Sequence, residues 1–76
     1  METNEIQISR NIKSCREKFG KTQEDIAKIL DISKPTYINI ENNPLNCSIN
    51  KLNKVAVAIG CNINEFFLKS KFTKSE

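Results

Sequence analysis

Residues 22–41, TQEDIAKILDISKPTYINIE, decide the fold because they encode two short helices separated by a tight turn. Thr22 is a predicted N-cap, with Asp25 three residues later in the manner of a capping box. The apolar residues that follow share one helical face: Ile26, Ala27 and Leu30. The spacing therefore predicts a helix that begins near Gln23 and ends around Asp31, a residue that tolerates the left-handed backbone of a helix end.

A second helix is predicted from Lys34 to Asn42, directly after a turn formed by Asp31 and Ile32. Ser33 offers its cap, and Pro35 falls in its first turn, where a missing amide hydrogen costs little. Two residues three apart are expected to face inward, namely Tyr37 and Ile40. Two helices joined in this way form a helix-turn-helix, and the outer side of the second helix is left open.

The open side of the second helix is the expected reading face for double-stranded DNA, and its residues are Lys34, Pro35, Thr36, Ile38 and Asn39. Asn39 matches an adenine edge, and Lys34 matches guanine acceptors or a phosphate. The methyl groups of Thr36 or Ile38 suit a thymine methyl, although Ile38 also suits a protein contact. Pro35 either fixes the first turn or touches a base methyl.

Phosphate contacts are expected from Gln23 and Ser33 at the two helix starts, although Gln23 would also suit a merely exposed helical position. Residues 10–20 carry four basic side chains and one acidic side chain, whereas residues 21–43 have a net charge of −1. Because the recognition unit itself is not basic, further phosphate attraction is expected from the first helix, from Asn43 in the loop, and from Lys51 or Lys54.

Three further helices complete the predicted all-α, compact five-helix fold. The first runs from near Asn4 to Gly20, with an inner stripe of Ile8, Ile12, Cys15 and Phe19. The fourth follows Ser48 and ends at Gly60, with inner positions Ile49, Leu52, Val55, Ala56 and Ile59. The fifth begins at Asn62 with Glu65 as its capping-box partner, and it carries Ile63, Phe66, Phe67 and Leu68.

Length and composition indicate one small domain over residues 1–76, with a core of about residues 6–68 and a frayed tail from 69 to 76. The longest apolar run, residues 55–59, is far shorter than the ~20 residues of a membrane span. No leader follows Met1, so we expect a cytoplasmic protein without membrane contact.

Catalytic and metal chemistry is not expected of this chain. It has three cysteines and no histidine, so neither a zinc site nor a disulfide framework is predicted. A general base near the cysteines and a glycine-rich phosphate loop are also missing from the sequence. We therefore expect no enzyme activity and no cofactor.

Several motifs occur in the order and spacing of one known family: TQEDIAKIL, ISKPTY, the pair Ile40-Glu41, and AVAIG. Through them the chain resembles the Cro/C1-type (XRE) helix-turn-helix family, the DNA-binding domains of lambdoid phage repressors and their bacterial relatives. The resemblance covers roughly residues 8–67. It implies a lambda-repressor-like fold, a DNA face containing Gln23, Ser33, Lys34, Thr36 and Asn39, and an ion pair between Arg16 and Glu41. The turn residue that is usually glycine is Asp31 here.

The expected function is sequence-specific regulation of transcription by a homodimer on a near-palindromic operator, as in phage regulators, restriction–modification controllers or antitoxins. Surplus apolar residues near the C-terminal end predict the dimer interface: Val57, Phe67, Leu68 and Phe72. In the alternative interpretation, Phe66 and Phe67 cap the core and Phe72 belongs to a loose tail. A second alternative for the whole chain is a protein-binding module, such as the antitoxin partner of a toxin.

Overall fold

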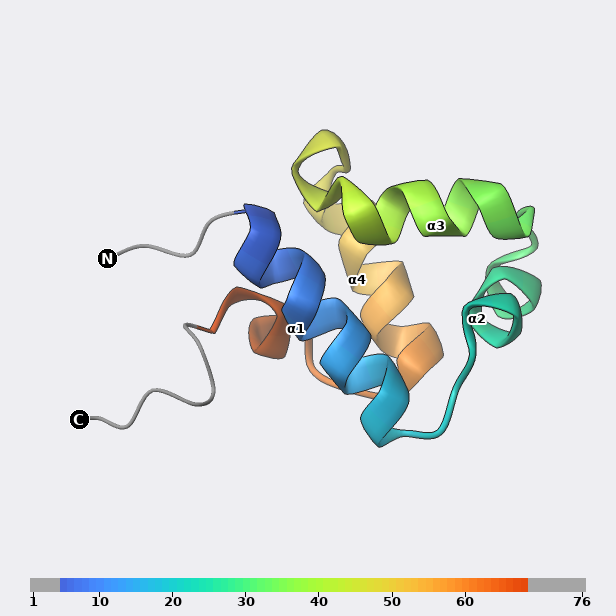
Figure 1. Cartoon of the computed structure of the whole chain (residues 1–76), viewed down its shortest axis with the longest axis horizontal. Helices are drawn as coiled ribbons and strands as arrows, with labels where there is room; N and C mark the ends of the chain where they lie inside the picture. Colours follow the sequence, from blue (N-terminus) through green and yellow to red (C-terminus); the bar gives the residue numbers. More distant parts are fainter. Residues whose placement is uncertain (1–4, 69–76) are drawn as a thin grey trace.

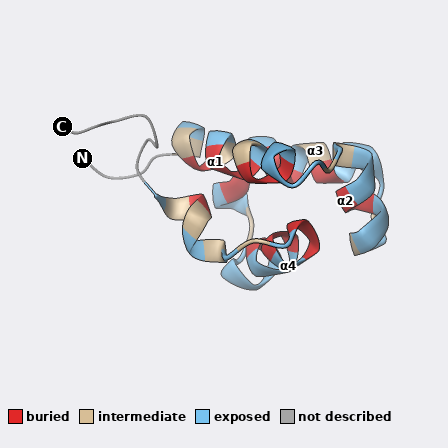
Figure 2. Cartoon of the chain, turned by 90° about the horizontal axis from the view of Figure 1, so that it is seen from below, coloured by how far each residue is buried: buried red, intermediate tan, exposed pale blue. Residues whose placement is uncertain are grey.

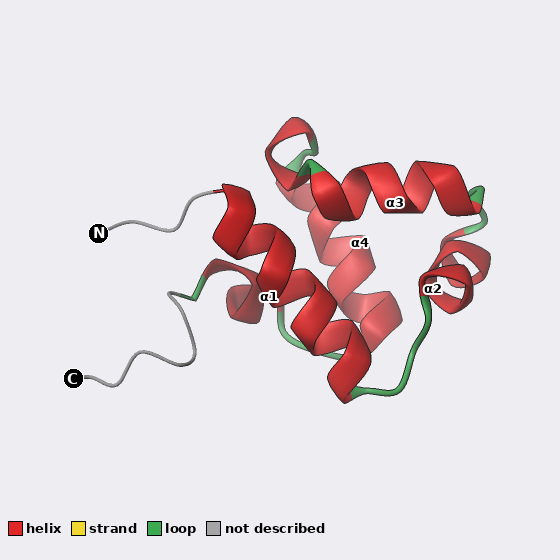
Figure 3. Ribbon diagram, in the orientation of Figure 1, coloured by secondary structure: helices red, strands yellow, loops and turns green. Residues whose placement is uncertain are grey.

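The computed structural model describes residues 5–68, and over this range the chain forms α-helices and 3₁₀ turns without any strand (Figure 3). The elements in chain order are α1 Glu5–Lys18, α2 Gln23–Leu30, α3 Lys34–Asn42, the 3₁₀ turn η1 Pro44–Asn46, α4 Ile49–Ile59 and the 3₁₀ turn η2 Ile63–Phe67. The predicted all-α class is confirmed. The start expected for the first helix at Asn4 lies outside the described residues.

Helix α2 has the predicted ends. Thr22 Oγ1 accepts a hydrogen bond from Asp25 N at 3.0 Å, and Asp25 Oδ2 accepts one from Thr22 N at 2.8 Å, which is a reciprocal capping box. These two bonds hold the pKa of the Asp25 carboxyl below its ordinary value. At the other end Asp31 is left-handed, with φ 60° and ψ 46°, and Ile32 N donates to Ala27 O at 3.0 Å. The chain can therefore reverse within two residues before α3.

The buried residues gather between α4 on one side and α1 and α3 on the other (Figure 2). Helix α4 passes behind α1 and α3 in Figure 1, and α2 packs against both α3 and α4. All helices contribute to one apolar core: Ile8, Ile12, Cys15, Ile26, Ala27, Tyr37, Ile40, Leu52, Val55, Ala56, Ala58, Ile59 and Phe66. The core supports the helix-turn-helix from the side opposite to its open face.

Two predicted core residues, Phe19 and Ile49, are not in the core. Phe19 is 45% exposed because α1 ends at Lys18 and the chain turns through Gly20, whose φ of 70° is left-handed. Its ring lies beside Gly60 instead, where an added Cβ would stand 3.6 Å from it. Ile49 is 62% exposed because it is the first residue of α4, and the helix turns its buried side inward only from Leu52 onward.

The predicted fifth helix is a single 3₁₀ turn. Glu65 N donates to Asn62 O at 2.9 Å, and the Asn62 side chain accepts from Asn64 N at 2.8 Å, two residues ahead rather than three. Phe66 is fully buried, and Leu68 already lies beyond the end of the turn. Five residues suffice to place one aromatic ring in the core, and the chain does not continue as an α-helix.

A buried asparagine, which the sequence analysis did not single out, attaches this C-terminal segment to α1. Asn11 lies between Ile8 and Ile12 on the inner side of α1. Its Nδ2 donates to Phe66 O at 3.0 Å and to Leu68 O at 2.7 Å, and its Oδ1 accepts from Gln7 Nε2 at 2.9 Å. Because its polar atoms are satisfied, Asn11 can be buried without the penalty of an unpaired amide.

Candidate nucleic-acid interface

The outer side of α3 is open to solvent. The residues predicted to read bases lie there, with Ile38 half-buried and the others exposed, namely Lys34, Pro35, Thr36 and Asn39. The opposite side of the helix is buried and holds Tyr37, Ile40 and Glu41. Since the buried side anchors α3 in the core, the polar side is presented outward on a fixed support.

The start of α3 is held by Ser33 and Thr36. Ser33 Oγ accepts from Thr36 N at 3.2 Å and donates to Thr36 Oγ1 at 2.8 Å. Both groups are hydroxyls, so the proton between them can come from either side. The Ser33 hydroxyl can therefore turn to the phosphate predicted for it while Thr36 donates in its place.

A buried carboxylate joins the three helices around the recognition unit. Glu41 is fully buried, and its Oε2 accepts from Arg16 Nε at 2.8 Å. Its Oε1 accepts from Gln23 Nε2 at 2.9 Å and from Arg16 Nη2 at 3.3 Å. The two residues of the ion pair implied by the resemblance thus lie together, and Gln23 of α2 is attached to the same carboxylate.

Tyr37 and Arg16 complete this buried network. The Tyr37 hydroxyl donates to Glu41 Oε2 at 2.9 Å, and Arg16 Nη1 donates to Lys21 O at 3.0 Å. Burial, together with the negative charge of Glu41, raises the pKa of Tyr37 well above its ordinary value of 10.0. Burial acts to lower the pKa of Arg16, but its hydrogen bond to Glu41 and the charge of Glu41 outweigh this and raise it. Both groups therefore keep their protons at neutral pH, which the hydrogen bonds require.

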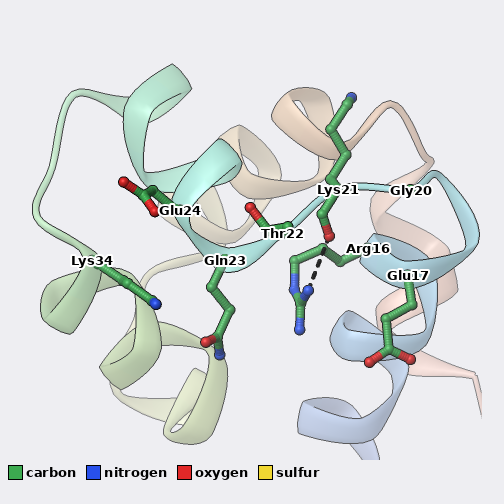
Figure 4. Close-up of a pocket in the computed structure, with 8 residues that line it drawn as sticks. All are labelled: Arg16, Glu17, Gly20, Lys21, Thr22, Gln23, Glu24 and Lys34. Atoms are coloured by element: carbon green, nitrogen blue, oxygen red, sulfur yellow. Dashed lines mark hydrogen bonds between the residues drawn. The ribbon is translucent and has the colours of Figure 1, made fainter.

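A hollow of about 560 Å³ opens in front of the α2 N-terminus, between the end of α1 and the start of α3. Figure 4 shows the Gln23 and Lys34 side chains directed into the space between α2 and α3, with Arg16 bonded to the Lys21 carbonyl beside it. The charged residues that line the hollow are Arg16, Glu17, Lys21, Glu24 and Lys34. Basic side chains and the amides of a helix N-terminus attract a phosphate, and the carboxylates of Glu17 and Glu24 weaken that attraction.

At the other end of α3, two asparagines lie side by side. Asn43 Nδ2 donates to Asn39 Oδ1 at 2.8 Å and to the Asn39 backbone O at 3.3 Å. Asn43 N also donates to Asn39 O at 2.9 Å, so that Asn43 is the C-cap of α3. The predicted base reader Asn39 is therefore in contact with the predicted loop residue Asn43.

Lys51 lies beside the recognition helix. A smaller hollow of about 150 Å³ is lined by residues of α2, the turn, α3 and α4: Leu30, Ile32, Thr36, Ile40, Lys51 and Lys54. Both α4 lysines therefore border the start of α3, near the exposed Thr36. They add positive charge next to a recognition unit whose net charge is −1.

Comparison with known proteins identifies the family. A family model described as helix-turn-helix matches residues 12–66. The chain belongs to the XRE-type helix-turn-helix family. It is also similar to the control protein C.MunI from a Mycoplasma species, with 32% identity over 63 residues, which cover 82% of this chain and 85% of that protein. No solved structure matches the chain significantly.

As a member of the XRE-type family, the protein is a DNA-binding regulator of transcription. The matched range includes α2, the turn and α3 completely, and it ends within η2. None of the helices described in residues 5–68 is long and apolar enough to cross a membrane.

The residues predicted to form the dimer interface occupy different environments. Val57 is 71% exposed and borders a groove of about 370 Å³ between α2 and α4, which Ile29 and Ala58 also line. Phe67 is half-buried against the core, in line with the alternative interpretation, while Leu68 is exposed. Phe72 lies outside the described residues.

The three cysteines are free thiols. Burial and the neighbouring Cys15 raise the pKa of the Cys61 thiol to about 12, so that it stays protonated and unreactive at neutral pH. Within residues 5–68, no group of three or more potential metal ligands comes together.

The Tyr37 hydroxyl and the contact between Asn43 and Asn39 were missed from the sequence, yet a signal for both was present. Tyr37 precedes Glu41 by four residues, as Asn39 precedes Asn43. Residues four apart are neighbours on a helix surface. Polar pairs at this spacing within a recognition helix or at its end are therefore worth testing as hydrogen-bonded pairs.

Proposed function

We propose that the protein binds a specific near-palindromic DNA site as a homodimer and regulates transcription there. The observation that carries this proposal is the orientation of α3, which buries Tyr37, Ile40 and Glu41 and leaves Lys34, Thr36 and Asn39 exposed. Its outward residues meet base edges in the major groove, with Asn39 reading adenine and Lys34, at the N-terminus, reading guanine or a phosphate. Gln23 and the hollow beside it hold the flanking phosphate.

Dimerisation supplies the DNA affinity that a single subunit lacks. The recognition unit has a net charge of −1, so a single copy has weak phosphate attraction. Two copies related by a two-fold axis place two α3 helices in successive major grooves, ~34–36 Å apart. Val57 and Leu68, both exposed and apolar, are the described residues offered for the contact. Operator occupancy then rises with protein concentration by mass action.

Selection of bound sequences from a random duplex pool tests this proposal. We expect a symmetric consensus with half-sites ~10 base pairs apart, centre to centre. Enrichment of a single, unpaired half-site would contradict the dimer, and absence of any consensus would contradict sequence-specific binding.

Two substitutions separate the proposed roles. Asn39→Ala should lose ~1–3 kcal/mol at particular operator positions, because it removes a base contact. Gln23→Ala should weaken all sequences about equally, because it removes a phosphate contact. Asn64→Ala, at an exposed asparagine of η2, is the control and should change neither. Equal losses across every operator variant for both Asn39 and Gln23 would contradict the assignment.

A protein-binding module remains the second candidate, and the groove between α2 and α4 favours it. Ile29 and Val57 are both exposed there, and an apolar groove of this kind suits a partner protein such as a toxin. Co-purification of a neighbouring gene product by a chain that shows no salt-dependent DNA binding would support this candidate. Gel-shift binding to the DNA upstream of its own gene would support the regulator.

A further inference from the structure

The two amides at the end of α3 define each other's orientation. The backbone O of Asn39 can only accept hydrogen bonds, so the Asn43 side-chain atom 3.3 Å away must be its Nδ2 donor. The same Nδ2 lies 2.8 Å from the Asn39 side chain, which must therefore offer its acceptor, Oδ1. The backbone carbonyl of Asn39, which can only accept, therefore fixes the orientation of the Asn43 amide and, through it, that of the Asn39 amide.

This orientation leaves the two hydrogens of Asn39 Nδ2 and one lone pair of Oδ1 for another partner. Adenine presents an acceptor, N7, next to a donor, the N6 amino group, on its major-groove edge. A carboxamide held with its nitrogen and oxygen side by side matches that pair without turning over. Asn39 is exposed, so without Asn43 its amide would be free to rotate.

We propose that Asn43 is a positioning residue for base recognition, which holds the Asn39 carboxamide in the orientation that reads adenine. This rests on the proposed DNA-reading role of α3 and adds to it a residue that acts through another residue. Fixing the amide beforehand reduces the rotational freedom that is lost on binding. Asn43 therefore contributes to the preference for adenine even where it contacts no base itself.

The test measures a ratio of affinities. For the wild-type protein, Kd is determined on the selected duplex and on duplexes with the other three base pairs at the position read by Asn39. We expect Asn43→Ala to reduce the preference for adenine ~2- to 10-fold, the range expected for losing the order of one side chain. A direct phosphate contact by Asn43 would lower all affinities alike and leave the ratio unchanged.

Two further variants sharpen the result. Asn43→Asp offers only acceptors, which repel Asn39 Oδ1, so it should reduce the adenine preference at least as much as Asn43→Ala. Asn42→Ala, at the exposed neighbouring asparagine, is the matched control and should leave the ratio unchanged. Thermal unfolding of each variant shows that it is folded at the assay temperature, so a change in ratio reports on recognition.

The outcomes distinguish this inference from the proposed function. If the wild type prefers adenine and Asn39→Ala removes that preference, but Asn43→Ala leaves the ratio within twofold, the positioning role is overturned and DNA reading stands. If Asn39→Ala leaves the preference intact, Asn39 is not the reader and the inference is also overturned. If the wild type discriminates at no position, both proposals are overturned.

Discussion

Replacing Glu41 by glutamine should destabilise the domain severely. The carboxylate is fully buried and accepts hydrogen bonds from three residues: Arg16, Gln23 and Tyr37. Glutamine keeps one acceptor oxygen but removes the charge, so the Arg16 guanidinium, whose side chain is only 10% exposed, loses its buried counter-charge. Removing one partner of a buried pair costs ~3–5 kcal/mol.

That loss is large for a chain of 76 residues, whose whole free energy of unfolding is expected to be ~4–11 kcal/mol. For a domain of this size, the lower end of the loss corresponds to a fall in Tm of at least ~12 °C. Urea unfolding of Glu41→Gln, followed by circular dichroism, gives the free energy of unfolding directly. Glu17→Gln removes an exposed charge next to Arg16 in sequence and should stay within ~0.5 kcal/mol of the wild type.

The double variant Arg16→Met/Glu41→Leu separates the pair itself from the burial of an unpaired charge. Without any buried charge to compensate, it should be more stable than Glu41→Gln. If Glu41→Gln loses less than ~1 kcal/mol, the carboxylate behaves like a solvated surface charge, and the structural role assigned to the network is refuted.

Three further predictions concern other parts of the molecule. Tyr37 is the only tyrosine, so tyrosinate absorbance reports on it alone. Its pKa is raised on folding, so its stabilising contribution is complete below pH 10 and should be lost as the pH rises further. Tyrosinate absorbance should then appear together with unfolding. Asp31→Gly should raise the free energy of unfolding by up to ~1 kcal/mol, because φ is 60° there, and should strengthen DNA binding by removing a negative charge. Urea unfolding and gel shifts measure the two effects, and the prediction is wrong if neither the free energy of unfolding nor the DNA affinity increases. Val57→Asp should shift the light-scattering mass from dimer to monomer, whereas Ile49→Asp, at another exposed apolar residue of α4, should not. An unchanged mass for Val57→Asp would exclude Val57 from the interface.

The helix-turn-helix was predictable from local chemistry. Thr22 and Asp25 cap α2, Asp31 ends it in the left-handed region, and Ser33 caps α3, as the sequence indicates. These features depend on residues within four positions of one another, so spacing alone reveals them. The exposed and buried sides of α3 followed from the same spacing.

Predictions from the sequence were wrong or incomplete where contacts between distant segments determine the structure. Phe19 continues an apolar stripe, yet the chain leaves the helix before it and packs the ring beside Gly60. The segment after Asn62 has a capping pattern, yet it needs only a 3₁₀ turn to bury Phe66. The polar contacts of Asn11 with residues more than fifty positions away could not be read from spacing, because they depend on how α1 meets the C-terminal segment.

The candidate site shows the same division. Which residues lie on the outer side of α3 was predictable, and the four-residue spacing of Asn39 and Asn43 was a signal for their contact. The attachment of Gln23 in α2 to Glu41 was not predictable, because it depends on three helices converging at one carboxylate. Hydrogen-bond partners depend on three-dimensional proximity as well as on residue type.

The most direct test of the central claim follows backbone amide chemical shifts in an isotope-labelled sample during titration with the selected duplex. The account predicts that the largest changes fall on residues 22–24, at the start of α2, and on residues 33–39 of α3 with its cap. A scrambled duplex at the same salt concentration should produce smaller changes at Asn39. Changes confined to the groove around Val57, with α3 unaffected, would contradict the claim that α3 reads DNA.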